Sequence, residues 1–183
     1  MKKVLTIAGS DSSGGAGIQT DLKTFAALGV YGMSAITAIT AQNTLGVKRV
    51  ERVSASMVKD QIRAIFEDIE VDAVKIGMLA EIDIIEAVRD CIDLYRPKFV
   101  VLDPVMVSTS GFDLLNSQAK KVLIEGLIPL VDLITPNLAE TACILNLIGR
   151  AGLDIDGWAK MEEAGMIIAG HTGKNILVKG GHL

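Results

Sequence analysis

The stretch Gly9-Ser10-Asp11-Ser12-Ser13-Gly14-Gly15-Ala16-Gly17 decides how the N-terminal part of this chain folds. It follows the apolar run Val4–Ala8, which is typical of a buried strand, and precedes Ile18, Leu22 and Phe25 at helical spacing. A glycine-rich turn between a strand and a helix offers free backbone N–H groups and the positive end of the helix dipole. We interpret it as a binding loop for a polar or anionic ligand rather than as a turn that only packs a helix onto a sheet.

Two common glycine motifs do not match this loop. A Walker A loop needs Gly-Lys-Ser/Thr after its spacer, whereas Gly9 and Gly14 are followed by Gly15-Ala16. A dinucleotide fingerprint needs a third glycine, but Gly15-Ala16-Gly17 is followed by Ile18-Gln19-Thr20. The loop alone therefore does not define its ligand.

Strand-like and helix-like segments alternate along the rest of the chain. We expect strands at 33–40, 73–76, 99–102, 132–134 and 175–178, and a short edge strand at 47–53. We expect helices that begin at the caps Ser54 and Asn116, helices at 81–95 and 156–169, and a helix that runs on from the segment 135–140 towards Leu147. This alternation predicts one α/β domain over residues 1–183, a layer sandwich with helices on both faces of a mainly parallel sheet.

Composition excludes several classes of protein. The chain has 183 residues, as expected for one domain, and a net charge of −4 without a basic cluster, which argues against binding to nucleic acid. It shows no signal-peptide pattern and no apolar run long enough for a membrane span. Cys91 and Cys143 match no metal-binding spacing and are expected as small core residues on helices. We therefore expect a cytoplasmic protein without a membrane partner.

Polar clusters follow the expected strands at several points. The carboxyl ends of parallel strands meet at one edge of a sheet, where ligands bind. We therefore expect the following groups to gather there: the 9–17 loop, Gln42, Met78, Asp103, Asn137, Glu140 and Lys179.

The residue types at this edge suit phosphoryl transfer. Asp103 and Glu140 are carboxylates suited to Mg²⁺ held partly through water, and Lys179 has a charge for a phosphate. Gln42 offers the donor and acceptor that an aminopyrimidine edge requires. Each has a structural alternative, since Asp103 could cap a turn, Glu140 could stabilise a helix N-terminus and Lys179 could be solvated.

The chain resembles the hydroxymethylpyrimidine/phosphomethylpyrimidine kinases of thiamine synthesis, in the ribokinase superfamily. Six motifs carry this resemblance in the same order along essentially the whole chain: Ala8–Gln19, Thr40–Thr44, Lys75–Leu79, Asp103–Met106, Thr135–Asn137 with Glu140, and Val178–His182. The resemblance implies an ATP- and Mg²⁺-dependent kinase that acts on a hydroxymethylpyrimidine and then on its monophosphate.

The resemblance also assigns site residues. It implies substrate contacts from Gln42, Asp11, Ala16, Gly17, Met78 and Val105, so that the glycine loop holds the pyrimidine rather than nucleotide phosphates. It implies ATP contacts from Asp103, Asn137, Glu140 and Lys179, with Asp103 and Glu140 facing the metal.

The sequence departs from the family pattern at one motif. The family continues to a Gly-Thr-Gly segment that forms an anion hole and contains the catalytic base, but no Gly-Thr-Gly occurs here. The resemblance thus leaves no catalytic residue among these positions and places the base beyond Leu183. We expect a truncated kinase that is nearly inactive alone, because loss of one anion-hole donor costs ~10²–10³ in rate.

Alternatives remain at the level of substrate and activity. Pyridoxal kinases of the same superfamily use related chemistry, and a shortened relative that binds the pyrimidine without transferring phosphate is a further alternative. We expect the Gly/Ser/Thr-rich segment Ser108–Phe112 to act as a lid loop, and the 47–53 region to contribute to a homodimer contact.

Overall fold

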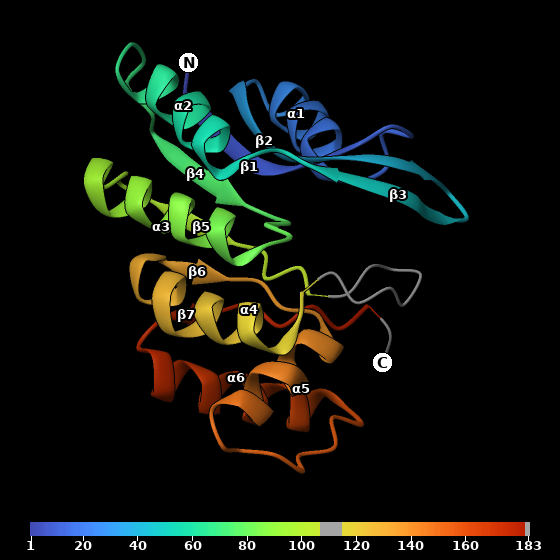
Figure 1. Ribbon diagram of the computed structural model, residues 1–183. Helices are drawn as coiled ribbons and strands as arrows, with labels where there is room; N and C mark the ends of the chain where they lie inside the picture. Colours follow the sequence, from blue (N-terminus) through green and yellow to red (C-terminus); the bar gives the residue numbers. More distant parts are fainter. Residues whose placement is uncertain (107–114, 182–183) are drawn as a thin grey trace.

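The computed structural model describes residues 1–106 and 115–181. Within these residues the chain forms a seven-stranded sheet with the order β3-β2-β1-β4-β5-β6-β7 (Figure 1). Neighbouring strands are parallel except for β2 and β3. The strands are β1 (Lys3–Asp11), β2 (Tyr31–Asn43), β3 (Gly46–Arg52), β4 (Ala73–Ile76), β5 (Val100–Leu102), β6 (Leu133–Ile134) and β7 (Asn175–Ile176). The predicted α/β sheet is confirmed.

Helices cover both faces of this sheet, as predicted. They are α1 (Gly17–Ala27), α2 (Ala55–Phe66), α3 (Ile82–Tyr95), α4 (Ser117–Val122), α5 (Leu138–Leu147) and α6 (Trp158–Thr172). On β2, a Cβ added to Gly32 would lie 2.8 Å from Leu22 Cδ2 of α1. The next residue, Met33, belongs to the core cluster with Val58 and Ile62 of α2. Because side chains alternate along a strand, α1 and α2 cover opposite faces.

The core lies between the sheet and the helices α2 and α3, and it extends to residues of α4, α5 and α6. Side chains of β1, β4 and β5 that point into it are at most 1% exposed, namely Leu5, Ile7, Val74, Ile76, Val100 and Leu102. Thr6 and Lys75 alternate with them and face the α1 side, where both bond to Asp21. The central strands therefore place polar side chains on one face only.

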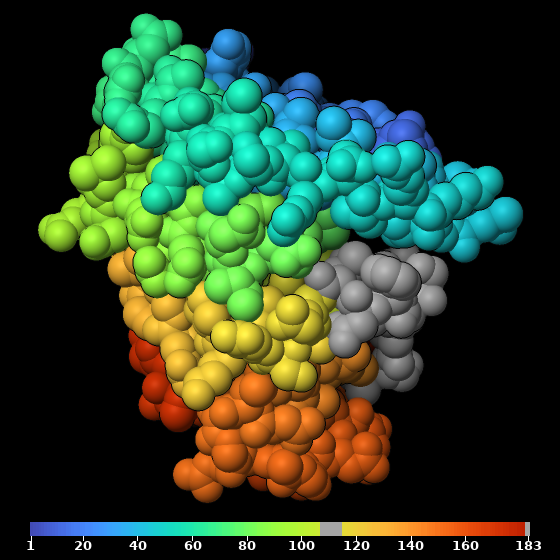
Figure 2. Space-filling view, viewed as in Figure 1, coloured from blue at the N-terminus to red at the C-terminus, as the bar shows by residue number. Residues whose placement is uncertain are grey.

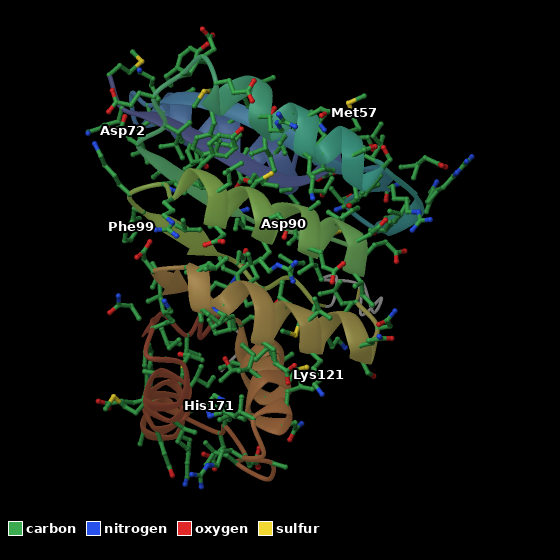
Figure 3. All side chains as sticks on the ribbon, turned by 60° about the vertical axis from the view of Figure 1, so that its left-hand side comes forward. Met57, Asp72, Asp90, Phe99, Lys121 and His171 are labelled. Carbon is green, nitrogen blue, oxygen red and sulfur yellow. The ribbon has the colours of Figure 1, made fainter. Side chains whose placement is uncertain are left out.

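Two expected helix caps are confirmed. The Ser54 hydroxyl accepts a hydrogen bond from the backbone N–H of Met57 at 3.3 Å, and the Asn116 side chain accepts one from Ala119 at 2.9 Å. Figure 3 shows Met57 pointing away from the sheet, and it is 52% exposed. The helix after Asn116 is less regular than expected, since α4 continues into a π-helical turn (Leu123–Leu127) and a 3₁₀ turn (Ile128–Leu130).

The strands around the glycine loop are longer than the sequence pattern predicts. β1 continues through Gly9 to Asp11, and β2 continues through Gln42, so both of these segments belong to strands rather than to loops. The antiparallel partner β3 extends β2, with Gln42 opposite Val47. Figure 2 shows the resulting hairpin projecting beyond the body of the protein.

Some segments that carried expectations are not among the described residues. Ser108–Phe112, expected as a lid loop, lies outside the described residues, as does His182. Across residues 1–106 and 115–181, no helix is both long and apolar enough to traverse a lipid bilayer.

Candidate functional site

A cavity of about 340 Å³ opens at the carboxyl ends of the parallel strands. All ten residues that the sequence nominated line it: Asp11, Ala16, Gly17, Gln42, Met78, Asp103, Val105, Asn137, Glu140 and Lys179. They come from the ends of six different strands and from the first turns of α1 and α5. The shared edge predicted from the strand–helix alternation is therefore present, and it forms a concave site.

The Asp11 carboxylate organises the glycine loop. Its Oδ1 accepts hydrogen bonds from the backbone N–H and hydroxyl of Ser13, both at 2.8 Å. Its Oδ2 accepts bonds from the backbone N–H groups of Gly15 at 2.9 Å and Ala16 at 2.8 Å. Burial alone would raise the pKa of Asp11, but these bonds outweigh it, and the pKa lies below its ordinary value. The Asp11 carboxylate thus fixes the conformation of the loop through hydrogen bonds to the loop backbone.

Close packing explains two of the glycines. Gly17 opens α1 with φ +57°, and a Cβ there would overlap the carbonyl oxygen of Gly9. A Cβ on Gly9 would lie 2.5 Å from Cε of Met78. The Met78 backbone is fixed in turn, because its carbonyl accepts a bond from the Thr37 hydroxyl at 2.7 Å. These contacts bring the backbones of β1, α1 and the β4 end together at the cavity floor.

Gln42 is attached to the glycine loop through Ser12. The Ser12 hydroxyl donates to the Gln42 carbonyl at 2.7 Å and accepts from its backbone N–H at 3.0 Å. The Thr40 hydroxyl shares its proton between the Ser10 carbonyl at 2.9 Å and Oε1 of Gln42 at 3.2 Å. The half-buried Gln42 amide lies beside it at the cavity wall.

The other end of the cavity has a charged pair and a capped helix. The Nζ of Lys179 donates to Oδ1 of Asp103 at 2.6 Å. Asn137 and Glu140 form a capping box at the start of α5, in which each side chain accepts the other's backbone N–H, at 2.8 and 2.9 Å. Val105 follows Asp103 in a turn closed by the bond from its N–H to the Asp103 carbonyl at 2.8 Å.

The Glu140 side chain is only 3% exposed, and this burial changes its protonation equilibrium. Burial raises the pKa of Glu140, and the nearby Asp103 carboxylate adds to this, while the N–H of Asn137 and the ammonium of Lys179 oppose it. Glu140 therefore both caps a helix, as the structural alternative for this residue suggested, and lines the cavity.

The described residues contain no group of three or more His, Cys, Asp or Glu side chains arranged to hold a metal ion. Among the described residues that line the cavity, Asp103 and Glu140 are the carboxylates beside Lys179. Such a pair suits Mg²⁺, which takes one or two protein carboxylates and completes its shell with phosphate oxygens and water.

Sequence reasoning missed Asp21 and Lys75, which also line the cavity. Lys75 Nζ lies 2.9 Å from Oδ2 of Asp21, and their side chains are only 24% and 16% exposed. Asp21 resembles a solvated helix residue in the sequence. Lys75 did carry a signal, because it is a charged residue inside the otherwise apolar strand Ala73–Ile76.

The two cysteines lie on helices, as expected, and no disulfide joins them. Cys91 of α3 is buried and belongs to the core, and burial raises the pKa of its thiol. Cys143 of α5 is partly buried against the same core. Neither lines the cavity.

The fold and this cavity define an α/β protein of the ribokinase-like class, with a small-molecule site outside the carboxyl ends of the strands. Residues 11–183 match the family model for phosphomethylpyrimidine kinase. The chain is 54% identical over 180 residues to hydroxymethylpyrimidine/phosphomethylpyrimidine kinase of Rhizobium meliloti, covering 98% of this chain and 65% of the relative. It therefore belongs to the phosphomethylpyrimidine kinase family.

Solved structures agree with this family and fold. A crystal structure of phosphomethylpyrimidine kinase from Clostridium difficile 630 is 50% identical with a TM-score of 0.87, covering 100% of this chain and 77% of that one. An ADP complex of Bacillus subtilis pyridoxal kinase is 40% identical with a TM-score of 0.83, covering 100% and 66%. The chain thus spans about two thirds of the length of its Rhizobium and Bacillus relatives.

Proposed function

We propose that this protein takes part in the ATP-dependent phosphorylation of 4-amino-5-hydroxymethyl-2-methylpyrimidine and of its monophosphate in thiamine biosynthesis, in the cytoplasm. The observation that carries the proposal is the single cavity lined by all ten nominated residues. Membership of the phosphomethylpyrimidine kinase family supports the same chemistry.

The two ends of the cavity suit the two substrates. In the proposed reaction the hydroxymethyl oxygen bonds to the γ-phosphorus, the bond from that phosphorus to its bridging oxygen breaks, ADP leaves and the hydroxyl proton passes to a base. The glycine loop and Gln42 surround the end assigned to the pyrimidine. Lys179, Asp103 and the N-terminus of α5 surround the end assigned to the phosphates, where an ammonium and a helix dipole favour negative charge.

Magnesium fits the phosphate end. Asp103 and Glu140 would hold it together with phosphate oxygens, and the ion would neutralise charge on the transferred phosphoryl group. Before any ion binds, Lys179 neutralises Asp103 through their 2.6 Å contact. Burial raises the pKa of Glu140, and a bound cation would oppose this by favouring the ionised form.

Pyridoxal is the second candidate substrate. Pyridoxal kinase from Bacillus subtilis, at 40% identity, has the same fold with a TM-score of 0.83. The described pocket residues do not include a feature that only a pyridine ring would require. A comparison of both substrates on the same protein separates these candidates, and a pyrimidine-binding protein without kinase activity would bind the pyrimidine but transfer no phosphate.

We further propose self-association through the β2–β3 hairpin. β3 is an edge strand, and the hairpin exposes Ile39 by 55% and Leu45 by 89%. Edge strands with exposed apolar side chains favour pairing with another chain. Sedimentation should show a dimer that Leu45→Asp weakens, and a monomer at all concentrations of the unaltered protein would contradict this proposal.

Calorimetric titration tests the function directly. The protein should bind 4-amino-5-hydroxymethyl-2-methylpyrimidine, and Gln42→Ala should weaken that binding by about 1–3 kcal/mol, because a desolvated hydrogen bond is lost. Binding of Mg·ATP, measured separately, should change little in this variant. If the unaltered protein bound neither the pyrimidine nor pyridoxal, the proposed function would be wrong.

A further inference from the structure

Ser12 joins the glycine loop to the projecting β2–β3 hairpin (Figure 2). Its hydroxyl donates to the Gln42 carbonyl at 2.7 Å and accepts from the Gln42 backbone N–H at 3.0 Å. Among the residues that the structure describes, these two are the hydrogen bonds between Gln42 and the glycine loop. Gln42 is one of the described residues that line the cavity, whereas Ser12 is not. Ser12 thus holds a residue of the cavity wall from outside the cavity.

The two Ser12 bonds lie just beyond the point where the backbone pairing of β1 with β2 ends. That parallel pairing runs as far as Asp11 opposite Thr40. Further along β2, its register with β3 shifts between Ala41 and Gln42. Such an irregularity bends a strand and redirects its side chains. At Gln42 the Ser12 hydroxyl therefore takes the place of a backbone partner from β1.

Ser12 is itself held in a fixed turn. The N–H of Gly14 donates to the Asp11 carbonyl at 3.0 Å, which closes the turn around Ser12 and Ser13. The backbone N–H and the hydroxyl of Ser13 donate to the Asp11 carboxylate, both at 2.8 Å. A short side chain on a turn held in this way has little freedom of movement. The Ser12 hydroxyl therefore sets the position of the Gln42 backbone.

The side-chain amide of Gln42 is held less firmly than its backbone. The Thr40 hydroxyl reaches Oε1 of Gln42 at 3.2 Å, but it lies closer to the Ser10 carbonyl, at 2.9 Å. Nε2 of Gln42 donates to none of the residues that the structure describes, so its N–H groups are available to a ligand. The position of this amide therefore depends on where the Gln42 backbone lies.

Stability alone gives little reason for the two Ser12 bonds. Ser12 is exposed, so water can replace its hydroxyl at the Gln42 backbone. Substitutions at such exposed positions usually change stability little. Water would satisfy the backbone groups of Gln42, but it would not fix the distance between the glycine loop and the hairpin. The Ser12 hydroxyl does fix this distance, because it bonds to both backbone groups at once.

We infer that Ser12 is a positioning residue for the pyrimidine and that it acts through Gln42. By holding the Gln42 backbone against the glycine loop, Ser12 presents the side-chain amide to the substrate in the geometry that a hydrogen bond requires. This inference rests on the proposed function, in which Gln42 binds the pyrimidine. It adds a residue outside the cavity that determines how well Gln42 does so.

A double-mutant cycle tests this inference. Calorimetric titration with 4-amino-5-hydroxymethyl-2-methylpyrimidine compares the unaltered protein with Ser12→Ala, with Gln42→Ala and with the double variant. Ser12→Ala should weaken binding by roughly three- to tenfold, the range expected for one hydrogen bond. In a protein that already carries Gln42→Ala, the same change should have almost no effect, because no amide is left to position. Residues that act independently would instead give losses that add.

A rescue variant and a matched control complete the experiment. Ser12→Thr keeps the hydroxyl, and the exposed position leaves room for its methyl group, so it should bind the pyrimidine as the unaltered protein does. Ser54→Ala is the control, because Ser54 is also exposed and its hydroxyl accepts from a backbone N–H, that of Met57, at the start of α2. This control should leave the pyrimidine affinity unchanged. Urea unfolding should show that every variant is folded, and all should bind Mg·ATP equally.

The outcomes separate this inference from the proposed function. A folded Ser12→Ala protein that binds the pyrimidine as tightly as the unaltered protein would overturn the inference and leave the function standing. Losses that add in the double variant would also overturn it, since Ser12 would then act independently of Gln42. A Ser12→Thr protein as weak as Ser12→Ala would show that the hydroxyl is not responsible. No pyrimidine binding by the unaltered protein would contradict both the inference and the function.

Discussion

Replacing Asp11 with asparagine tests the idea that one carboxylate builds the ligand loop. The change keeps the size and shape of the side chain but turns one acceptor oxygen into an NH₂ donor. The carboxylate accepts from three backbone N–H groups, those of Ser13, Gly15 and Ala16. An asparagine oxygen placed toward Gly15 and Ala16 keeps two of these bonds and turns its NH₂ group toward the N–H of Ser13.

The structure sets the size of the effect. At least one bond to a charged group is lost, at about 1.5–3 kcal/mol, and the remaining two become bonds to a neutral amide, which are roughly half as strong. Asp11 is 3% exposed, so water cannot fully replace the lost bond. We expect Asp11→Asn to lower the free energy of unfolding by about 3 kcal/mol at pH 7.

Urea unfolding at several pH values provides the assay. The pKa of Asp11 is below its ordinary value in the folded protein, so its contribution is complete above that ordinary value. It is lost as pH falls through the folded pKa, and the difference between the variant and the unaltered protein should shrink there. The exposed Asp154, replaced by asparagine, serves as the control for loss of charge. A loss below about 1 kcal/mol for Asp11→Asn at pH 7 would refute the assigned role.

Two further changes test the cavity walls. Because burial raises the pKa of Glu140, its stabilising contribution is complete below its ordinary value of 4.5 and is lost as pH rises through the folded pKa. Glu140→Gln should therefore gain stability relative to the unaltered protein as pH rises through this range in urea unfolding, and a pH-independent difference would contradict this. Gly17→Ala should destabilise by more than the ~1–2 kcal/mol of a left-handed residue, because its Cβ also overlaps the Gly9 carbonyl. Gly29→Ala is the control, because Gly29 has φ +69° and no atom lies within 4 Å of a Cβ placed there. Thermal unfolding compares the two variants, and an equal loss of stability in both would contradict the predicted overlap at Gly17.

Much of the fold could be predicted because the strands and helices alternate along the chain. The strand Ala73–Ile76 matches the structure residue for residue, since its buried residues Val74 and Ile76 alternate with less buried ones and Gly77 follows directly. The ends of β1 and β2 could not be predicted, because they are set by pairing with each other and with β3. A strand that continues through Gly9, Asp11 and Gln42 depends on these tertiary contacts rather than on local preference.

The location of the candidate site could be predicted from the sequence, but the contacts of its side chains could not. Sequence order puts Asp103, Asn137 and Lys179 after three different strands, and a parallel sheet brings such positions together. The direction of each side chain could not be predicted. Asp11 turns inward to its own loop, and Lys75, which lines the cavity, pairs with Asp21, a helix residue 54 positions earlier in sequence.

The strand order also bears on how the protein is made. β1, at the centre, is synthesised first, and each later strand joins an outer edge of the sheet already present: β2 and β3 on one side, then β4, β5, β6 and β7 on the other. No strand has to insert between two others, so a growing chain on the ribosome can add to its sheet in the order of synthesis. Lys179 comes after the last of these strands and completes the cavity only when that strand has joined. A nascent chain should thus form its glycine loop early, and the part of the cavity wall that contains Lys179 only after β7 has joined the sheet.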